Sequence, residues 1–307
     1  MTAYRYFTAD VFTARRFSGN QLAVLPNADG LSDGEMLAVA REFNYSETTF
    51  VLPARDSRNT KGVRIFTPGG EVPFAGHPTV GTAFVLASIG EIGLTGDETR
   101  VVFEEGVGPV PVLIRSQGGR PVFSRLTAGK PPEIGPSLPS RAELARILSL
   151  DESDLLDGRL PGRFEPQVVS CGLAFALVPL RTRDAVRRSR IRLEAWDASL
   201  AGTPGANVMV FAMDAEERGH DVRARMFGPG VSVPEDPATG SACAALGGYL
   251  ADRANASDGM LRWVVEQGYE MGRPSLLEIE VEKRKGAIAA IHVGGASVMV
   301  CEGKIEI

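Results

Sequence analysis

Two segments of the chain are apolar on every side of a helix. Residues 78–89 and 241–251 have helical length, yet almost all of their side chains are apolar or small. A helix without a polar face is buried on all sides. Because short strand-like runs surround both segments, the pattern predicts two sheets, each curled around its own central helix.

Strand-like runs bounded by glycine and proline make up most of the remaining chain. The 35 Gly and 20 Pro residues are spread along the sequence, which indicates many turns. Two helices with a polar face are also expected, because Ser32 with Glu35 and Ser140 with Glu143 form capping-box sequences ahead of apolar residues at helical spacing. The sequence therefore predicts an α+β chain with few helices.

The two halves of the chain carry an internal repeat. Phe66-Thr67-Pro68-Gly69 and Phe227-Gly228-Pro229-Gly230 lie 161 residues apart, and each leads through a Val-Pro pair to one of the apolar helices. A chance match in a chain rich in Gly and Pro is the alternative. A length of 307 residues also suggests two domains. We expect a duplicated half-molecule, with a first domain of residues 1–128 plus 295–307 and a second of residues 129–294.

The charge balance argues against a general attraction to nucleic acid or to anionic membranes. The chain has 33 basic and 38 acidic residues and a net charge of −5. The arginine cluster at 181–192 is interpreted as a solvated helix, because no aromatic residues are interleaved. No apolar stretch is long enough to span a membrane. Three unpaired cysteines are typical of a reducing cytoplasm, and Cys171 and Cys301 are expected in the core.

Both apolar helices begin next to a glycine. The first is entered through Ala75-Gly76-His77-Pro78-Thr79, where Pro78 suits the first helical position, and the second through Thr239-Gly240-Ser241. Free backbone N–H groups at a helix start favour an anion, and glycine lets a ligand approach the backbone. If the halves pack face to face, both starts would meet one cleft for a small carboxylate-bearing substrate. Glycines that serve only tight turns explain the local sequence equally well.

Titratable side chains gather at these junctions. His77 at a helix start is expected to be neutral, because the helix dipole lowers its pKa, although a lone histidine is more often structural. From its local sequence alone, Asp236 is interpreted as a helix cap and Glu47 as a solvated carboxylate. The sequence shows no phosphate-binding loop, dinucleotide motif, metal-ligand spacing or nucleophile elbow. Cofactor-free proton transfer, without a metal, is the chemistry left to these residue types.

Several longer motifs resemble the PhzF-like isomerases of phenazine biosynthesis. They are ordered along the whole chain, and in that order they are Phe17-Ser18-Gly19-Asn20-Gln21-Leu22-Ala23-Val24, Ser46-Glu47-Thr48, Glu71-Val72-Pro73-Phe74-Ala75-Gly76-His77-Pro78-Thr79, Arg225-Met226-Phe227, Glu235-Asp236-Pro237-Ala238-Thr239-Gly240-Ser241-Ala242 and Gln267-Gly268-Tyr269-Glu270-Met271-Gly272-Arg273-Pro274-Ser275. The resemblance implies a fold like that of diaminopimelate epimerase, in which two similar domains each wrap a β-barrel around a central helix. It also implies an active site between the domains, a homodimer and no cofactor.

The resemblance further implies roles for individual residues. Glu47 would be the general acid/base that removes a proton from one substrate carbon and returns it to another. The implied catalytic residues are Glu47, His77, Asp236 and Ser241. The implied substrate-binding residues are Asn20, Ser46, Gly76, Thr239 and Gly240, with backbone N–H groups at both helix starts holding the substrate carboxylate.

We therefore expect a cofactor-independent isomerase acting on a small carboxylate. Related epimerases use two opposed thiols just before a helix-entry glycine, but Ala75 and Thr239 take those places here, and Cys243 lies inside the second helix. An epimerase or racemase with Glu47 and Asp236 as opposed bases is one alternative. A small-ligand-binding protein without turnover is another. Gly69-Gly70, where relatives carry a bulkier residue, leaves the identity of the substrate open.

Overall fold

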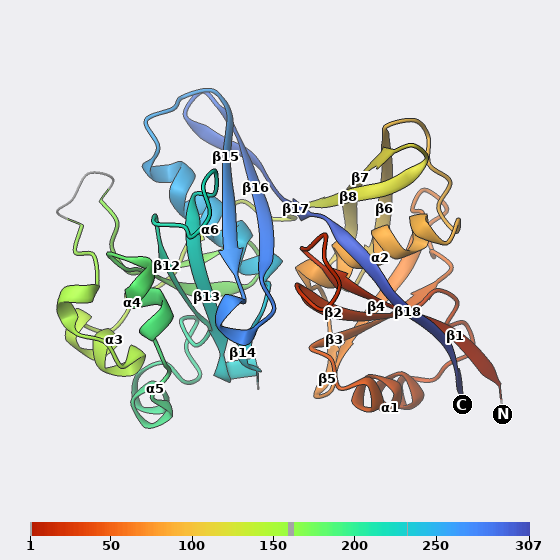
Figure 1. Cartoon of the computed structure of the whole chain (residues 1–307), viewed down its shortest axis with the longest axis horizontal. Coiled ribbons are helices and arrows are strands. Elements are labelled where there is room, and N and C mark those ends of the chain that lie inside the picture. The colour runs from red at the N-terminus through yellow and green to blue at the C-terminus, as the bar shows by residue number, and fades with distance from the viewer. Residues whose placement is uncertain (1, 159–162, 232) are drawn as a thin grey trace. The chain divides into compact units, whose positions relative to one another are not determined.

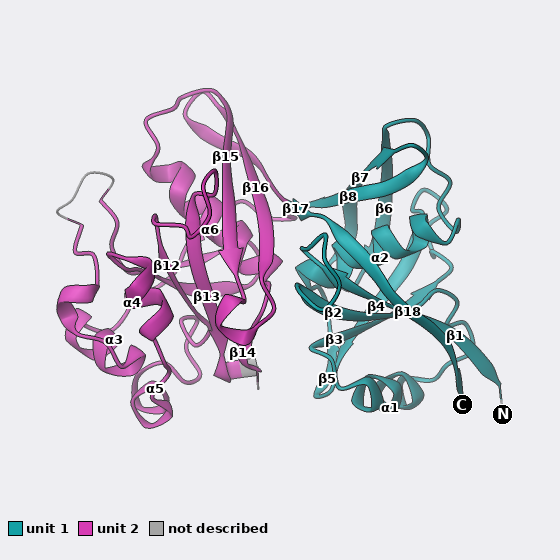
Figure 2. Ribbon diagram, in the orientation of Figure 1, with its two compact units in different colours: residues 1–127, 294–307 teal, residues 128–293 magenta. Residues whose placement is uncertain are grey.

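Strands outnumber helices in both halves of this chain. The computed structural model describes residues 2–158, 163–231 and 233–307. They form two compact units, unit 1 (Met1–Thr127 with Gly294–Ile307) and unit 2 (Ala128–Val293) (Figure 2). Both units combine many strands with few helices, so the α+β class expected from the sequence is confirmed. It stays a prediction that two separate domains fold here, one of residues 1–128 with 295–307 and one of residues 129–294.

Unit 1 surrounds one central helix with strands (Figure 1). Its helices are α1 (Asp33–Phe43) and the central α2 (Gly76–Ser88). Its strands are β1 (Ala3–Val11), β2 (Asn20–Leu25), β3 (Glu47–Leu52), β4 (Lys61–Thr67), β5 (Gly70–Val72), β6 (Glu98–Glu105), β7 (Gly108–Gln117), β8 (Arg120–Thr127) and β18 (Ser297–Glu306). Helix α2 packs against β1, β2, β3, β7, β8 and β18, and 12 of its 13 residues are buried.

Unit 2 is built in the same way around α6 (Gly240–Arg253). Its other helices are α3 (Arg141–Leu148), α4 (Arg183–Arg188) and α5 (Leu193–Ser199), with 3-10 turns at Glu152–Asp154, Pro229–Val231 and Tyr269–Met271. Its strands are β9 (Glu133–Ile134), β10 (Gln167–Ser170), β11 (Ala174–Pro179), β12 (Val208–Ala212), β13 (Val222–Gly228), β14 (Val233–Asp236), β15 (Gly259–Gln267), β16 (Ser275–Arg284) and β17 (Ala287–Gly295), whose last two residues belong to unit 1. Helix α6 packs against β10, β11, β15 and β16.

Strand pairing repeats between the units. In unit 1, β1–β2 is antiparallel, β2–β3 parallel, β3–β4 and β4–β5 antiparallel, and β4–β6 parallel. In unit 2, β10–β11, β11–β12, β12–β13, β13–β14 and β13–β15 repeat this series of directions. The short strands β5 and β14 lead directly into α2 and α6. The internal repeat that the sequence predicts is thus a repeat of topology.

The capped helices form as expected. Ser32 and Glu35 make a capping box at the start of α1, and Ser140 and Glu143 make one at the start of α3. The expectation for Pro78 was wrong, because α2 begins at Gly76 and Pro78 is its third residue. Proline is tolerated there, since the first N–H groups of a helix have no carbonyl partner within it.

Two further expectations need correction. Cys171 is buried, but Cys301 lies exposed on β18, where its Sγ is 3.0 Å from Thr8 Oγ1. Most residues of β18 are half-buried or exposed, so the run of apolar residues in this strand is not part of the hydrophobic core. The arginines of the 181–192 cluster are exposed, as expected, but the helix there covers only Arg183–Arg188 (α4), because Ser189 ends it.

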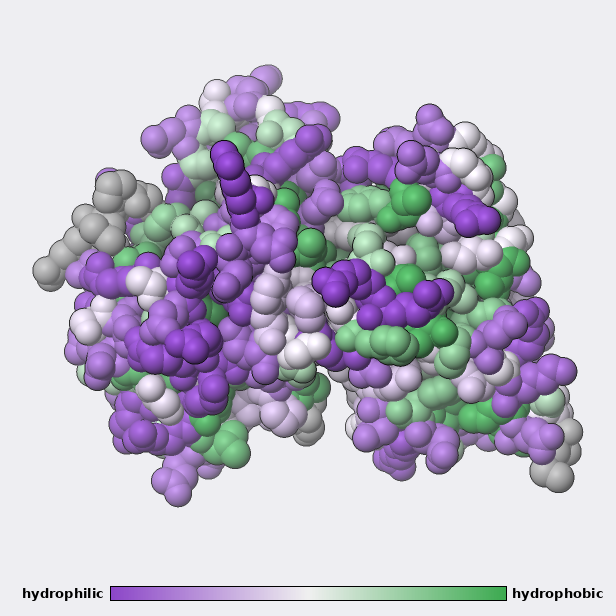
Figure 3. Space-filling model, viewed as in Figure 1, coloured by the Kyte–Doolittle hydropathy of each residue, from purple (hydrophilic) through white to green (hydrophobic). Residues whose placement is uncertain are grey.

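The surfaces of both units are mixed in polarity. On the face shown in Figure 3, hydrophilic and hydrophobic residues are interspersed over each unit. Within the described residues, no helix is both long and apolar enough to cross a membrane.

Candidate active site

Three of the predicted site residues meet in unit 1. Glu47 is the first residue of β3, Asn20 the first of β2, and His77 the second of α2. His77 Nε2 lies 3.5 Å from Glu47 Oε2, and Asn20 Nδ2 lies 3.2 Å from His77 Nδ1. We call Asn20, Glu47 and His77, with Ser46 and Gly76 beside them in the chain, the unit 1 half-site.

Burial controls the charge of His77. The ring is almost fully buried, and this desolvation lowers its pKa to about 3, against the raising effect of a hydrogen bond with the backbone of Gln21. The imidazole is therefore neutral at neutral pH. Its contact with Glu47 joins a neutral ring and a carboxyl group, so it is not an ion pair.

Strand register and buried hydroxyl groups fix this half-site. Strands β2 and β3 are parallel with Leu22 opposite Glu47, so both strands begin at the same edge. Thr49 Oγ1 lies 2.9 Å from Thr82 Oγ1, which ties β3 to the middle of α2. Glu47 and the start of α2 are thereby held in one place, although 30 residues separate Glu47 from His77 in the chain.

The two central helices begin without a side-chain cap. Ser32, Ser140 and Thr182 each accept a hydrogen bond from the first turns of α1, α3 and α4. By contrast, the N-cap residues of α2 and α6, which are Ala75 and Thr239, provide no such bond, and neither first turn contains an acidic residue. Uncapped helix starts favour anions, because their N–H groups and the helix dipole are both available.

The remaining predicted residues meet in unit 2. Asp236 ends β14 and is buried, and its Oδ2 accepts a hydrogen bond of 2.5 Å from Thr239 Oγ1. Gly240 and the half-buried Ser241 are the first two residues of α6. We call Asp236, Thr239, Gly240 and Ser241 the unit 2 half-site. In unit 1 the second helical residue is His77, and in unit 2 it is Ser241.

A buried arginine anchors the strand that carries Asp236. The guanidinium of Arg225 on β13 donates two hydrogen bonds of 2.8 Å to the Glu235 carboxylate, and its third nitrogen donates to the carbonyl oxygens of Val186, Arg187 and Ser189. Such bidentate pairs fix geometry as well as charge. Glu235 is therefore held next to Asp236, and the end of β14 has little freedom to move.

Cys243 is not a thiolate nucleophile. It lies inside α6 and is fully buried, and burial, together with the charge of Asp236, raises the pKa of its thiol well above the usual range. Among the described residues, no group of three or more His, Cys, Asp and Glu side chains is arranged to hold a metal ion.

Sequence reasoning overlooked two buried polar residues beside the half-sites. Gln267 contacts Asp236 and Thr239, and Glu105 lies 2.7 Å from Thr79 in the first turn of α2. Gln267 belongs to a motif that already carries the family resemblance, and that motif was the available signal. Glu105 follows another glutamate and precedes a glycine, a pattern that looks like an exposed turn.

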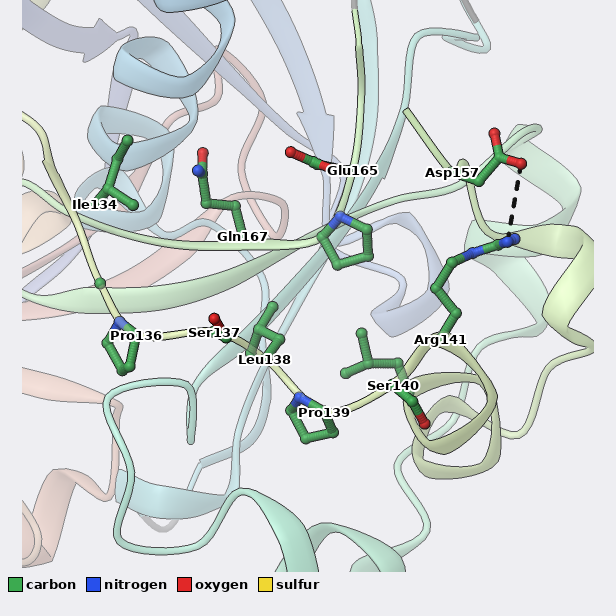
Figure 4. A pocket seen from close by; sticks show the side chains of 13 residues that line it. Ile134, Pro136, Ser137, Leu138, Pro139, Ser140, Arg141, Asp157, Glu165 and Gln167 are labelled. Atoms are coloured by element: carbon green, nitrogen blue, oxygen red, sulfur yellow. Dashed lines mark ion pairs between the residues drawn. The ribbon is translucent and has the colours of Figure 1, made fainter. Parts of the chain in front are cut away.

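A pocket of about 450 Å³ lies elsewhere in unit 2. It is bordered by proline residues and by the pair Arg141–Asp157, whose charged atoms are 3.9 Å apart (Figure 4). None of the predicted site residues lines this pocket.

Comparisons with known proteins identify the family of this chain. Residues 9–303 match the model of the PhzC-PhzF family, described as phenazine biosynthesis-like protein. A protein of Mesorhizobium japonicum, named an uncharacterised isomerase, is 36% identical over 100% of both chains. Trans-2,3-dihydro-3-hydroxyanthranilate isomerase of Pseudomonas aeruginosa is 33% identical, covering 98% of this chain and 99% of its own. The crystal structure of a phenazine biosynthesis protein of the PhzF family from Bacillus anthracis superposes with a TM-score of 0.87 at 26% identity, covering 100% of both chains.

Proposed function

This chain belongs to the family of phenazine biosynthesis-like, PhzF-like isomerases. On that premise, we propose that it moves a proton between two carbons of a small carboxylate-bearing substrate without a cofactor. The observation that carries the proposal is the distance of 3.5 Å between the Glu47 carboxyl and the neutral ring of His77. A carboxylate is a suitable general base when a second group orients it.

The reaction balances with Glu47 as the single base. The Glu47 carboxylate accepts a proton from a substrate C–H bond, and the electron pair of that bond enters the substrate π system. Glu47 then returns the proton to a second carbon, and the double bond has shifted. No electrons are gained or lost, so this reaction needs no redox partner.

His77 has an orienting role in this proposal. Because the ring is neutral, it offers one N–H donor and one acceptor nitrogen and adds no positive charge beside Glu47. Asn20 holds the opposite edge of the ring through Nδ2. Asn20 therefore acts through His77 as a positioning residue, in addition to the substrate-binding role implied by the resemblance.

The substrate carboxylate is assigned to the uncapped helix starts. Backbone N–H groups of Gly76 and His77 in unit 1, and of Gly240 and Ser241 in unit 2, would donate to it. We propose that Asp236 and Ser241 serve the same substrate and assist proton movement, and that Ser46 and Thr239 help to bind it. The family motifs and the matching starts of α2 and α6 support this assignment.

The name of one relative supports the proposed substrate class. The Pseudomonas aeruginosa relative is named for a hydroxylated anthranilate, which is a carboxylate. That compound is the first to test, followed by a panel of unsaturated hydroxy acids and amino acids. The resemblance also implies a homodimer, which the molar mass in solution tests, and the three cysteines favour a reducing cytoplasm.

Replacing Glu47 with glutamine tests the mechanism. We expect Glu47→Gln to lower turnover by about 10²- to 10⁴-fold, because the amide cannot accept the proton, while carboxylate binding is retained. Turnover is followed by NMR in D₂O and binding by calorimetry. Glu42→Gln, the same change at an exposed position on α1, should behave like the wild type.

The pattern of deuterium distinguishes the alternatives. A shielded shift by one base retains some of the substrate's own hydrogen at the second carbon. Deuterium at an inverted stereocentre, together with activity loss in both Glu47→Gln and Asp236→Asn, would indicate an epimerase with two bases. Wild-type turnover in Glu47→Gln would refute the proposed mechanism, and binding without any conversion across the panel would favour a ligand-binding protein.

A further inference from the structure

Gln267 is a fully buried amide at the end of β15, and all of its polar contacts lie on the unit 2 half-site. Its Nε2 donates to the backbone oxygen of Asp236 at 2.7 Å and to Thr239 Oγ1 at 3.0 Å. Its Oε1 accepts a hydrogen bond of 3.1 Å from the backbone N–H of Thr239. The amide therefore spans the turn that connects β14 to α6.

These contacts allow only one orientation of the amide. The Thr239 N–H needs an acceptor and the Asp236 carbonyl needs a donor, so a flipped amide would place donor against donor and acceptor against acceptor. With Nε2 directed at Thr239 Oγ1, that oxygen accepts a hydrogen bond. The single proton of the Thr239 hydroxyl is then left to donate to Asp236 Oδ2.

The chain after Gln267 is fitted to the same turn. Gly268 has φ +78°, and a Cβ there would lie 2.5 Å from the carbonyl oxygen of Pro237. Backbone packs on backbone at this point, so β15 cannot move away from the turn without losing the contact. Gln267 thus meets Asp236 and Thr239 from a fixed position.

We infer that Gln267 is a positioning residue for the reaction: it directs the Thr239 hydroxyl to Asp236 and holds the Asp236 carboxylate as a hydrogen-bond acceptor at the start of α6. A hydrogen bond donated to a carboxylate stabilises its ionised form. The inference rests on the proposed function only in giving Asp236 a part in proton movement.

The test replaces the amide donor without changing its shape. In Gln267→Glu, oxygen faces the Asp236 carbonyl and the Thr239 hydroxyl, so that hydroxyl turns away from Asp236. We expect the NMR titration midpoint of the Asp236 carboxyl, measured with ¹³C-aspartate and assigned through Asp236→Asn, to move to higher pH. We also expect kcat to fall by about 10- to 100-fold with a smaller change in KM, the range for a hydrogen bond to a charged group.

Two further variants keep the test decisive if Gln267→Glu folds poorly. Thr239→Val removes the hydroxyl at constant shape and should move the Asp236 titration in the same direction, whereas Thr239→Ser should keep it near the wild-type midpoint. Gln117→Glu, the same change at the exposed end of β7, controls for the change in net charge. Thr239→Val adds no charge, so it separates loss of the hydroxyl bond from the effect of a new charge beside Asp236.

The outcomes separate this inference from the proposed function. An unchanged Asp236 titration in folded Gln267→Glu and Thr239→Val would overturn the positioning role. If the Asp236 titration midpoint moves in both of these variants while Asp236→Asn keeps full activity, the positioning role is supported and the part given to Asp236 in the reaction is refuted.

Discussion

Glu105 is a carboxyl group that the fold keeps away from water. It ends β6 and is 6% exposed, and the turn after it packs against Pro73, just before α2. Thr79 Oγ1 lies 2.7 Å from Glu105 Oε1 and 2.8 Å from the carbonyl oxygen of Ala75. A hydroxyl carries one proton, so making both bonds requires a proton on Glu105. Burial raises the pKa of Glu105 to about 8, in agreement with this count of protons.

Stability should therefore depend on pH through Glu105. Between about pH 4.5 and 8 the folded chain keeps this proton and the unfolded chain releases it, so the free energy of unfolding falls as pH rises. Glu105→Gln cannot ionise. We expect it to match the wild type near pH 4.5 and to be more stable at pH 8, by about 3 to 5 kcal/mol as an upper range. Urea denaturation at several pH values measures the difference.

The neighbouring Glu104 provides a control of opposite sign. Its carboxylate accepts hydrogen bonds from the backbone of Asp56 and from Asn59, which lower its pKa. Its stabilising effect is present above the unfolded pKa and is lost as pH falls through the folded one. Glu104→Gln should thus be less stable than the wild type at neutral pH. An equal pH response in both variants would contradict this account.

Close approach of elements fixes the position of α2 and hence of His77. A Cβ on Gly81 of α2 would lie 2.5 Å from Val11 Cγ2 and 2.6 Å from Leu22 Cδ2, and both of those side chains are fully buried. The helix thus approaches β1 and β2 at a distance that only glycine permits.

Two glycine-to-alanine changes should have opposite effects on stability. Gly81→Ala must displace packed core and is expected to cost about 1–3 kcal/mol. Gly34→Ala, in the open first turn of α1, meets nothing within 4 Å and should be neutral or stabilising by up to about 1 kcal/mol. Thermal unfolding compares the two variants. A stabilised Gly81→Ala would show that α2 has room to move.

The elements differ in how far the sequence predicts them. Helices α2 and α6 were predictable because they are apolar on all sides, a pattern that only burial explains. Strand β15 has no comparable pattern, because it is buried only at its end, from Val265 to Gln267, and its earlier residues mix exposed and half-buried positions. The sequence motifs identified Glu47 and His77, but the register of β2 with β3 determines their contact.

Buried polar partners were beyond prediction from local sequence. Gln267 is 28 residues from Thr239, and Glu105 is 26 residues from Thr79. In both cases tertiary packing supplies the hydrogen-bond partner that offsets the free-energy cost of burying the polar side chain. A glutamine at a strand end and a glutamate beside a glycine look solvated until that packing is known.

At the scale of the whole molecule, unit 1 is assembled from both ends of the chain. Strand β18 pairs antiparallel with the full length of β1, from Ala3 opposite Glu306 to Val11 opposite Ser297. Backbone bonds between Thr2 and Ile307 and from Thr13 to Ala296 extend this pairing at each end. Unit 2 is continuous in sequence, from Ala128 to Val293. The two units should therefore respond differently to loss of the C-terminus.

Deleting residues 297–307 is the last test. Without β18, the backbone groups of β1 on that edge lose their partners. We therefore expect amide protection in unit 1 to collapse in hydrogen exchange, while unit 2 stays protected.

Conversely, residues 1–127 joined by a short flexible linker to 294–307 should fold, because Gly294 already packs against Ser124 of β8. A Cβ on Gly294 would lie 2.7 Å from the Ser124 carbonyl oxygen. Residues 1–127 alone should not unfold cooperatively, and if they do, β18 is dispensable and the two-segment domain is wrong.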